Sequence, residues 1–347
     1  FFVLLAHELG YWFAKLPPLQ AYSFDLLGSI CGVAVFTLIS AFSLPPVLWF
    51  LLLGAFFLLH AILTRLTSKK GLFGGMAALI GVFLLVFGAS ASRGGEFFWS
   101  PYYEIQTKDI QIENRKVGVT VLVNKDGHQQ MLDLSGDIED PFIESRKAFY
   151  DLPYQFFAEA PSHVLVLGAG TGNDVAAGLR NGARFIDAVE IDPVIANIGK
   201  EHPEQPYADP RVHIIVDDAR AFLERNNDTY DFITFGFLDS HRLFSSMASV
   251  RLDNYLYTVE NMKNVREHLK EGGIVAIAYT VHEQWIADRI FHLLGSIFEQ
   301  TPLVYQGNER AWGTIFFARN GAPLSQPEAL IQKAEFEETI LPASQGY

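Results

Sequence analysis

The chain has 347 residues, of which 50% are hydrophobic and 19% charged, and its formal net charge is −13. A mean hydropathy of +0.17 is too apolar for one soluble domain with an ordinary surface. Five basic and two acidic residues lie within residues 1–95, so the acidic excess belongs to the rest of the chain. An acidic chain of this kind argues against nucleic-acid binding, which needs a basic surface. It is compatible with a cationic substrate.

The first quarter of the chain predicts membrane helices. Three stretches, about 24–43, 45–64 and 71–91, have the length of roughly 20 mostly apolar residues that a bilayer-spanning helix needs. A fourth run, 1–14, is too short by itself and lacks the basic start of a signal peptide, so we interpret it as the end of a longer helix. The alternative is a cluster of buried core helices. The only cysteine, Cys31, lies in this region, which excludes disulfides within the chain.

The orientation of these helices in the membrane is predicted differently by the basic residues and by the ligand. If all four helices cross the bilayer, the cluster from Arg65 to Lys70 and the large domain lie on opposite sides. The positive-inside rule then places the large domain outside the cytoplasm. The nucleoside ligand inferred below is cytoplasmic, and on that ground we favour an integral, multi-pass membrane protein whose large domain faces the cytoplasm.

Three segments follow the predicted membrane helices of residues 1–93. Residues 94–160 form a linker and a small β-hairpin domain, because 103–134 alternates apolar and polar residues around a turn at 124–127. Residues 161–322 form the main domain, and 323–347 a C-terminal tail. From His163 onward, short apolar runs alternate with helical patterns, which predicts a Rossmann-like α/β fold with a parallel, doubly wound sheet. Ligands bind such sheets beyond the carboxyl ends of the strands.

A glycine-rich turn follows the first strand of this domain. Gly168, Gly170 and Gly172 permit a tight turn and close approach of a ligand, and the next helix offers N–H groups at its start. The third glycine of the dinucleotide fingerprint is replaced by Asn173, which disfavours a dinucleotide. Glu190 ends the second strand, where a carboxylate can accept both hydroxyl protons of a ribose. The alternative for Glu190 is a solvated loop acid.

Acidic residues also follow the third and fourth strands. Asp217 and Asp218 lie where an acid can accept a hydrogen bond from an adenine amino group, and Asp218 is also a candidate helix N-cap. Asp239 and His241 follow the fourth strand, and Asp239 is a candidate general base. Its alternative role is to organise the long loop to Asn254. No group of residues has the spacing of metal ligands, so no metal is expected.

The stretch from about Ser100 to Ala318 resembles the spermidine synthase (polyamine aminopropyltransferase) family, within the class I AdoMet-dependent transferase fold. The motifs that carry the resemblance are 164–172 (VLVLGAGTG), 189–192 (VEID), 209–212 (DPRV), 216–223 (VDDARAFL), 230–231 (YD) and 269–273 (LKEGG). The hairpin region adds 100–103 (SPYY) and 126–129 (DGHQ), and the first quarter resembles the membrane part of multi-pass relatives.

The resemblance implies AdoMet or decarboxylated AdoMet as the nucleoside, held by the glycine loop, Glu190, Asp217 and Asp218. It also implies Asp239 as the catalytic base, with Tyr103 and His241 as substrate-binding residues. Three positions depart from the family. Thr171 and Gly236 stand where the family has acids around the substrate amine, and Tyr103 stands for a glutamine that touches the nucleoside. Unpaired amine charges are costly to bury, so simple aminopropylation of a diamine is disfavoured.

Three functions fit these observations. The leading hypothesis is a membrane-anchored transferase that moves an aminopropyl or methyl group to a small-molecule acceptor such as a polyamine. The second is a non-catalytic scaffold subunit of a membrane complex, and a homodimer is a further expected assembly. The third is a transporter or sensor, for which only Glu8 and Asp25 are candidate intramembrane acids.

Overall fold

The structure of the chain is a computed structural model. It describes residues 2–64, 77, 79–85, 87–88, 95–136, 138–237, 255–281, 284–307, 313–327 and 336–338. The chain divides into two compact units, Phe1–Gln106 and Thr107–Tyr347.

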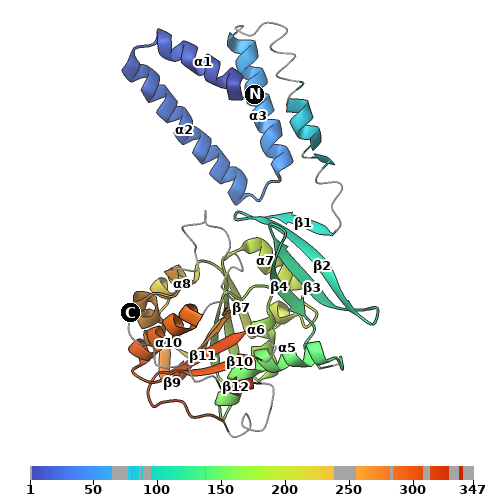
Figure 1. Ribbon diagram of the computed structural model, residues 1–347, viewed down its shortest axis with the longest axis vertical. Helices are drawn as coiled ribbons and strands as arrows, with labels where there is room; N and C mark the ends of the chain where they lie inside the picture. Colours follow the sequence, from blue (N-terminus) through green and yellow to red (C-terminus); the bar gives the residue numbers. More distant parts are fainter. Residues whose placement is uncertain are drawn as a thin grey trace. The chain divides into compact units, whose positions relative to one another are not determined.

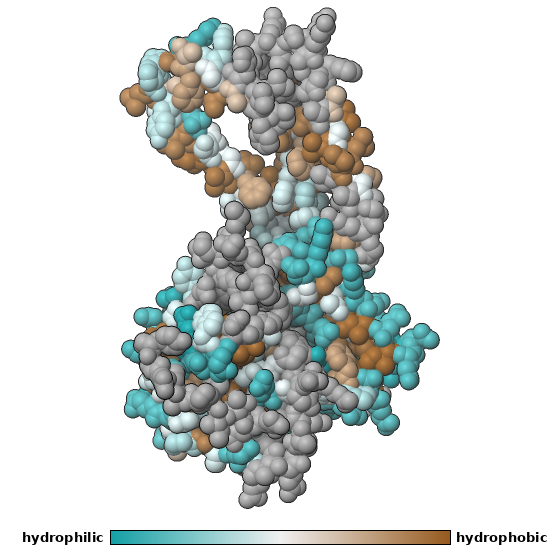
Figure 2. Space-filling model, viewed as in Figure 1, coloured by the Kyte–Doolittle hydropathy of each residue, from teal (hydrophilic) through white to brown (hydrophobic). Residues whose placement is uncertain are grey.

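The first unit contains three apolar helices, α1 (Phe2–Lys15), α2 (Pro18–Ala41) and α3 (Pro46–Thr64) (Figure 1). Large hydrophobic side chains on α2 and α3 are exposed, and they form brown areas on these helices in Figure 2. Within the described residues, α2 is the one helix whose length and hydropathy suit a membrane span: its apolar window has a hydropathy of 1.9 and is 6% buried. The expected span at about 71–91 lies largely outside the described residues.

An aromatic cluster joins α2, α3 and β1 (Glu96–Trp99) inside the first unit. The ring of Trp49 contacts the edges of Phe36 and Trp99, with ring centres 5.3 and 6.0 Å apart. Its indole nitrogen donates to the carbonyl of Leu44, 2.8 Å away. Edge-to-face contacts of this kind stabilise the corner between the two helices.

Strands β1 to β4 form a four-stranded sheet in chain order, with β2 at Glu104–Ile112, β3 at Arg115–Val123 and β4 at Asp126–Leu132. The turn expected at 124–127 is confirmed, because Asn124 and Lys125 have φ of +48° and +76°. A second turn at Glu113 and Asn114, with φ of +49° and +67°, was not expected. Tight hairpin turns require two positive φ values and favour Asn and Gly, so glutamate gave no signal there.

The second unit is built on an eight-stranded mixed sheet of order β12-β10-β11-β9-β8-β5-β6-β7. Its strands are β5 (His163–Leu167), β6 (Phe185–Glu190), β7 (Val212–Val216), β8 (Tyr230–Phe235), β9 (Leu269–Tyr279), β10 (Leu303–Gly307), β11 (Thr314–Arg319) and β12 (Phe336–Glu338). The expected parallel arrangement is confirmed for β5 to β9. Strands β10 to β12 are antiparallel, because β10 and β11 follow each other as neighbours and β11 returns beside β9.

Helices cover both faces of this sheet, which gives the Rossmann-like, doubly wound α/β fold (Figure 1). On one face α8 (Ala219–Arg225), α9 (Val259–Glu267) and α10 (Gln284–Phe298) pack on the strands. On the other face lie α5 (Pro141–Asp151), η1 (Leu152–Phe156) and α6 (Asn173–Arg180). Shorter elements are α7 (Pro193–Ile198), η2 (Gly199–Glu201) and η3 (Pro206–Ala208).

The strand order reverses between β5 and β8. Chain order runs from β5 outward through β6 to β7, and then returns on the other side of β5 through β8 to β9. This is the switch point where open α/β sheets bind ligands. Strand β9 begins at Leu269 opposite Tyr230, and a register shift separates this pair from Phe232 opposite Ile274.

Candidate active site

The glycine loop lies at the carboxyl end of β5, at the switch point. Gly168, Gly170 and Gly172 have φ of +70°, +55° and +106°, the left-handed region that favours glycine. The tight turn expected from the sequence is therefore confirmed. A Cβ on Gly170 would lie 2.4 Å from Oε1 of Gln129, so a larger residue here would displace that side chain from the loop.

Every backbone N–H of the loop already has an acceptor. Gly168 and Ala169 both donate to the carbonyl of Val189, at 2.9 Å, and Gly172 donates to the carbonyl of Ala169. Gly170 donates to Oε2 of Glu190 at 2.8 Å, and Thr171 donates to Oε1 of Gln129 at 3.0 Å. The loop is thus held from the neighbouring strand β6 and from β4, and its N–H groups are not directed at an empty anion site.

Glu190 is the central carboxyl of the site. It ends β6, is 6% exposed, and accepts from the N–H of Gly170 and, through Oε1, from the N–H of Asp192 at 2.9 Å. Burial raises the pKa of Glu190 to about 7, although the backbone N–H groups of Asp192, Gly170 and Ile191 favour the ionised form. A carboxylate has about four acceptor sites, so the group retains capacity to accept from a ligand.

Asp217 and Asp218 follow β7 on the next strand. Oδ1 of Asp218 accepts from the N–H of Ala221 at 2.9 Å, so the expected N-cap of α8 is confirmed. Asp217 accepts from the N–H of Asp218 and forms an ion pair with Arg225. Both carboxylates thus have protein partners. Asp192 caps α7 in the same way.

The buried amide of Asn173 connects this loop with the hairpin. Its Oδ1 accepts from the N–H of Leu132 and from Nε2 of His202, at 3.1 and 3.0 Å. Its Nδ2 donates to the carbonyl of Gln130 and to the hydroxyl of Tyr150, at 2.6 and 3.1 Å. Asn173 therefore makes four hydrogen bonds, and three separate segments meet at the start of α6.

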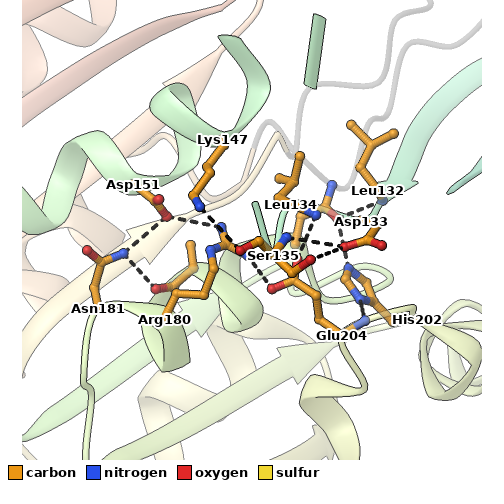
Figure 3. A network of polar contacts seen from close by, with 12 residues as sticks. Leu132, Asp133, Leu134, Ser135, Lys147, Asp151, Arg180, Asn181, His202 and Glu204 are labelled. Carbon is orange, nitrogen blue, oxygen red and sulfur yellow. Dashed lines mark hydrogen bonds and ion pairs between the residues drawn. The ribbon is translucent and has the colours of Figure 1, made fainter. Parts of the chain in front are cut away.

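A partly buried ion-pair network lies at the other end of α6 (Figure 3). Arg180 donates to both oxygens of Glu204, at 2.8 and 2.6 Å, and to Asp151 at 3.0 Å. Glu204 also accepts from the N–H of Leu134 at 2.9 Å, which attaches the end of the hairpin. His202 accepts through Nδ1 from the N–H of Glu204, and burial lowers its pKa to about 4, so it is a neutral structural group.

Three residues that support the loop were missed by sequence reasoning. Oε1 of Gln129 also accepts from the hydroxyl of Thr171 at 3.1 Å. Tyr207, on η3, donates to the carbonyl of Gly170 at 2.7 Å. The carboxyl of Asp174 lies beside Gly236: a Cβ on Gly236 would be 3.3 Å from its Oδ2. Gln129 was noted only as part of a motif, and nothing in the local pattern distinguishes Tyr207 or Asp174.

Three predicted site residues are not among those placed above. Tyr103 belongs to the first unit, where its ring lies beside that of Tyr102, with centres 5.8 Å apart. Asp239 and His241 lie outside the described residues, which on this side of the site end at Phe237. The described part of the chain contains no group of three or more His, Cys, Asp or Glu side chains that could hold a metal ion.

Comparison with known proteins gives a consistent family signal for the sheet domain. Residues 151–300 match the model of the spermine/spermidine synthase domain. A polyamine aminopropyltransferase of Korarchaeum cryptofilum is 28% identical over 148 residues, which are 41% of this chain and 43% of that protein. One from Alkaliphilus oremlandii is 36% identical over 117 residues, 33% and 38% of the two chains. The chain thus spans less than half the length of these curated relatives.

Solved structures give the same family names. The chain is similar to a probable spermidine synthase from Corynebacterium glutamicum, with 17% identity, a TM-score of 0.49, and coverage of 66% of this chain and 81% of that one. It is also similar to the spermidine synthase of Thermotoga maritima, with 17% identity, a TM-score of 0.48, and coverage of 63% and 70%.

Proposed function

We propose that this chain, whose residues 151–300 carry a spermine/spermidine synthase domain, is a membrane-anchored transferase of the aminopropyltransferase type. The nucleoside substrate is decarboxylated AdoMet or AdoMet, and the group transferred is aminopropyl or methyl. One observation carries the proposal above all others. A buried carboxyl, Glu190, lies next to a glycine loop at the switch point of the sheet and keeps lone pairs for a ribose.

The described residues have separate tasks in this proposal. Glu190 accepts the two ribose hydroxyls, and Asp218 accepts from the adenine amino group. Gly168, Gly170 and Gly172 keep the loop thin enough for the nucleoside to lie against it. Catalysis then consists mainly of alignment, because an amine and a sulfonium carbon held in line need little further help.

The transfer step requires one base. The acceptor nitrogen forms a bond to the carbon attached to the sulfonium, the C–S bond breaks with its electrons going to sulfur, and the nitrogen loses a proton. We assign that proton to Asp239, which follows β8 in the sequence, and we retain His241 and Tyr103 as candidate substrate-binding residues. The curated relatives bear the name polyamine aminopropyltransferase, which favours a polyamine as the acceptor here.

Membrane anchoring is the second part of the proposal. Helix α2 has 24 residues, which at 1.5 Å per residue is about 36 Å and exceeds a hydrocarbon core of about 30 Å. The 19-residue helix α3 is also apolar, and the sequence at 71–91 has the composition of a third span. We propose that these segments form a multi-pass anchor and that the second unit faces the cytoplasm.

Ligand binding tests the nucleoside site directly. Calorimetric titrations of the detergent-purified chain should use AdoMet, decarboxylated AdoMet and methylthioadenosine. They should be repeated with Glu190→Ala and with the control Glu224→Ala, an exposed acid on α8 that pairs with Arg220. We expect wild type and the control to bind, and Glu190→Ala to lose binding. A preference for decarboxylated AdoMet supports aminopropyl transfer, and a preference for AdoMet supports methyl transfer. No binding of any of the three by wild type refutes the proposal.

A further inference from the structure

The corner between α2 and α3 interrupts a long apolar stretch of the first unit. Helix α2 ends at Ala41, α3 begins at Pro46, and no Asp, Glu, Lys or Arg lies between Asp25 and Arg65. Non-helical backbone does not occur exposed to lipid in the hydrocarbon region of a bilayer, because its polar groups find no hydrogen-bond partners there. If α2 crosses a membrane, as proposed above, this corner therefore lies at the level of the lipid headgroups.

The segment that contacts this corner is strongly aromatic. Five of the seven residues in 97–103 (FFWSPYY) are aromatic, and none of the seven is charged. The ring of Trp99 contacts that of Trp49 on the first turn of α3, with ring centres 6.0 Å apart. The hydroxyl of Ser40, on the last turn of α2, donates to the carbonyl of Pro101 at 2.9 Å. Strand β1 and the turn after it are thus attached to the helix ends within the first unit.

The polar groups of this turn find hydrogen-bond partners within the first unit. The N–H of Ser100 donates to the carbonyl of Tyr103 at 2.9 Å. The hydroxyl oxygen of Ser100 accepts from the N–H groups of Tyr102 and Tyr103, at 3.1 and 3.0 Å. At the corner itself, the indole N–H of Trp49 donates to the carbonyl of Leu44. Hydrogen-bonded polar groups cost less to remove from water than unpaired ones, so this turn can lie in the headgroup region of a membrane.

Some aromatic rings at the corner are also exposed. Phe42 is 73% exposed and Tyr102 is 44% exposed. Tryptophan and tyrosine are enriched at membrane–water interfaces, because their rings are apolar and their N–H and O–H groups are polar. We infer that the corner between α2 and α3 and the turn at 99–102 form a binding surface for phospholipid headgroups, which Trp99 and Tyr102 enter. This inference rests on the proposed membrane anchor and extends it to residues beyond the predicted spans.

Depth-dependent quenching of tryptophan fluorescence tests the inference. The full chain is reconstituted in phosphatidylcholine vesicles with one tryptophan at a time, and every other tryptophan is replaced by phenylalanine. The lipids carry bromine either near the headgroup or near the ends of the acyl chains. Trp99 and Tyr102→Trp are two independent reporters of the turn, and Ile30→Trp marks the middle of α2. Trp285, which is 56% exposed on α10 of the second unit, is the control outside the membrane.

We expect Trp99 and Tyr102→Trp to lose more fluorescence to bromine near the headgroup, and Ile30→Trp to lose more to bromine near the chain ends. Trp285 should keep its fluorescence with both lipids. If Ile30→Trp is quenched while both reporters of the turn stay as bright as Trp285, protein rather than lipid covers the corner. That result, or stronger quenching of both reporters by deep bromine, overturns the inference but leaves the anchor in place. If neither lipid quenches Ile30→Trp, the proposed anchor and the inference both fail.

Discussion

Replacement of Asp174 by asparagine should stabilise the protein at alkaline pH. The pKa of Asp174 is raised from 3.8 to about 7 by burial, so the folded state holds a proton that the unfolded state has lost between these two values. Stability therefore falls as the pH rises from about 4 to about 7, and it stays lower above pH 7. Asparagine is neutral at every pH, so Asp174→Asn removes this loss.

The size of the effect follows from the same two values. Between pH 5 and pH 7 the wild type loses at most about 2.7 kcal/mol, at 1.36 kcal/mol per pH unit. The side chain keeps some contact with solvent, so we expect about 1–2 kcal/mol. For a unit of this size each kcal/mol corresponds to about 2–4 °C. The difference in melting temperature between Asp174→Asn and wild type should thus increase by about 2–8 °C from pH 5 to pH 8.

Asp231→Asn provides the matched control. Burial alone would raise the pKa of Asp231, but hydrogen bonds from Lys270 and from the N–H groups of Ser162 and His163 outweigh it and hold this pKa below the ordinary value. The ionised side chain of Asp231 therefore stabilises the folded state fully at pH 5 and at pH 8. Asp231→Asn should be destabilised by the same amount at both pH values. Differential scanning calorimetry of the full chain measures both variants. If the difference in melting temperature between Asp174→Asn and wild type does not change with pH, the reasoning is refuted.

Three further substitutions test the frame of the site. Arg180→Met leaves two partly buried carboxylates unpaired and should cost about 2–3 kcal/mol of unfolding free energy, of which Glu204→Gln in the same chain should restore part. Asn173→Ala removes four hydrogen bonds from buried partners and should cost about 2–4 kcal/mol, measured by thermal unfolding. Gly170→Ala places a Cβ against Gln129 and strains a positive φ by about 1–2 kcal/mol. Its affinity for methylthioadenosine should fall, and Gln129→Ala should relieve only the steric part; unchanged affinity contradicts this account.

Local sequence patterns were sufficient to predict much of the secondary structure of the sheet domain. Strands β5 and β7 and helix α8 have the bounds that apolar runs and caps indicate, because each short run is bounded by a cap or a glycine. Asp192 and Thr258 also cap the helices that follow them, as their spacing predicts. These features depend on residues within a few positions of one another.

The supports of the loop depend on distant residues and could not be predicted in this way. Asn173 stands 43 positions from Gln130 and 29 from His202, and its role is set by which segments the fold brings to the start of α6. The same holds for Tyr207 beneath Gly170 and for Asp174 beside Gly236. Sequence reasoning treated Asn173 only as a missing glycine, whereas its amide is the point where the hairpin and the loop join.

The hydrogen bonds within the glycine loop have a consequence for which nucleotides can enter. Dinucleotide enzymes hold a pyrophosphate with backbone N–H groups that point at it. Here Val189, Ala169, Glu190 and Gln129 accept all five of the N–H groups from Gly168 to Gly172. A phosphate at this position would also meet the charge of Glu190. Under the proposed function we therefore expect the loop to disfavour NAD, ATP and other phosphorylated compounds, and to accept a nucleoside whose 5′ substituent is a thioether or a sulfonium.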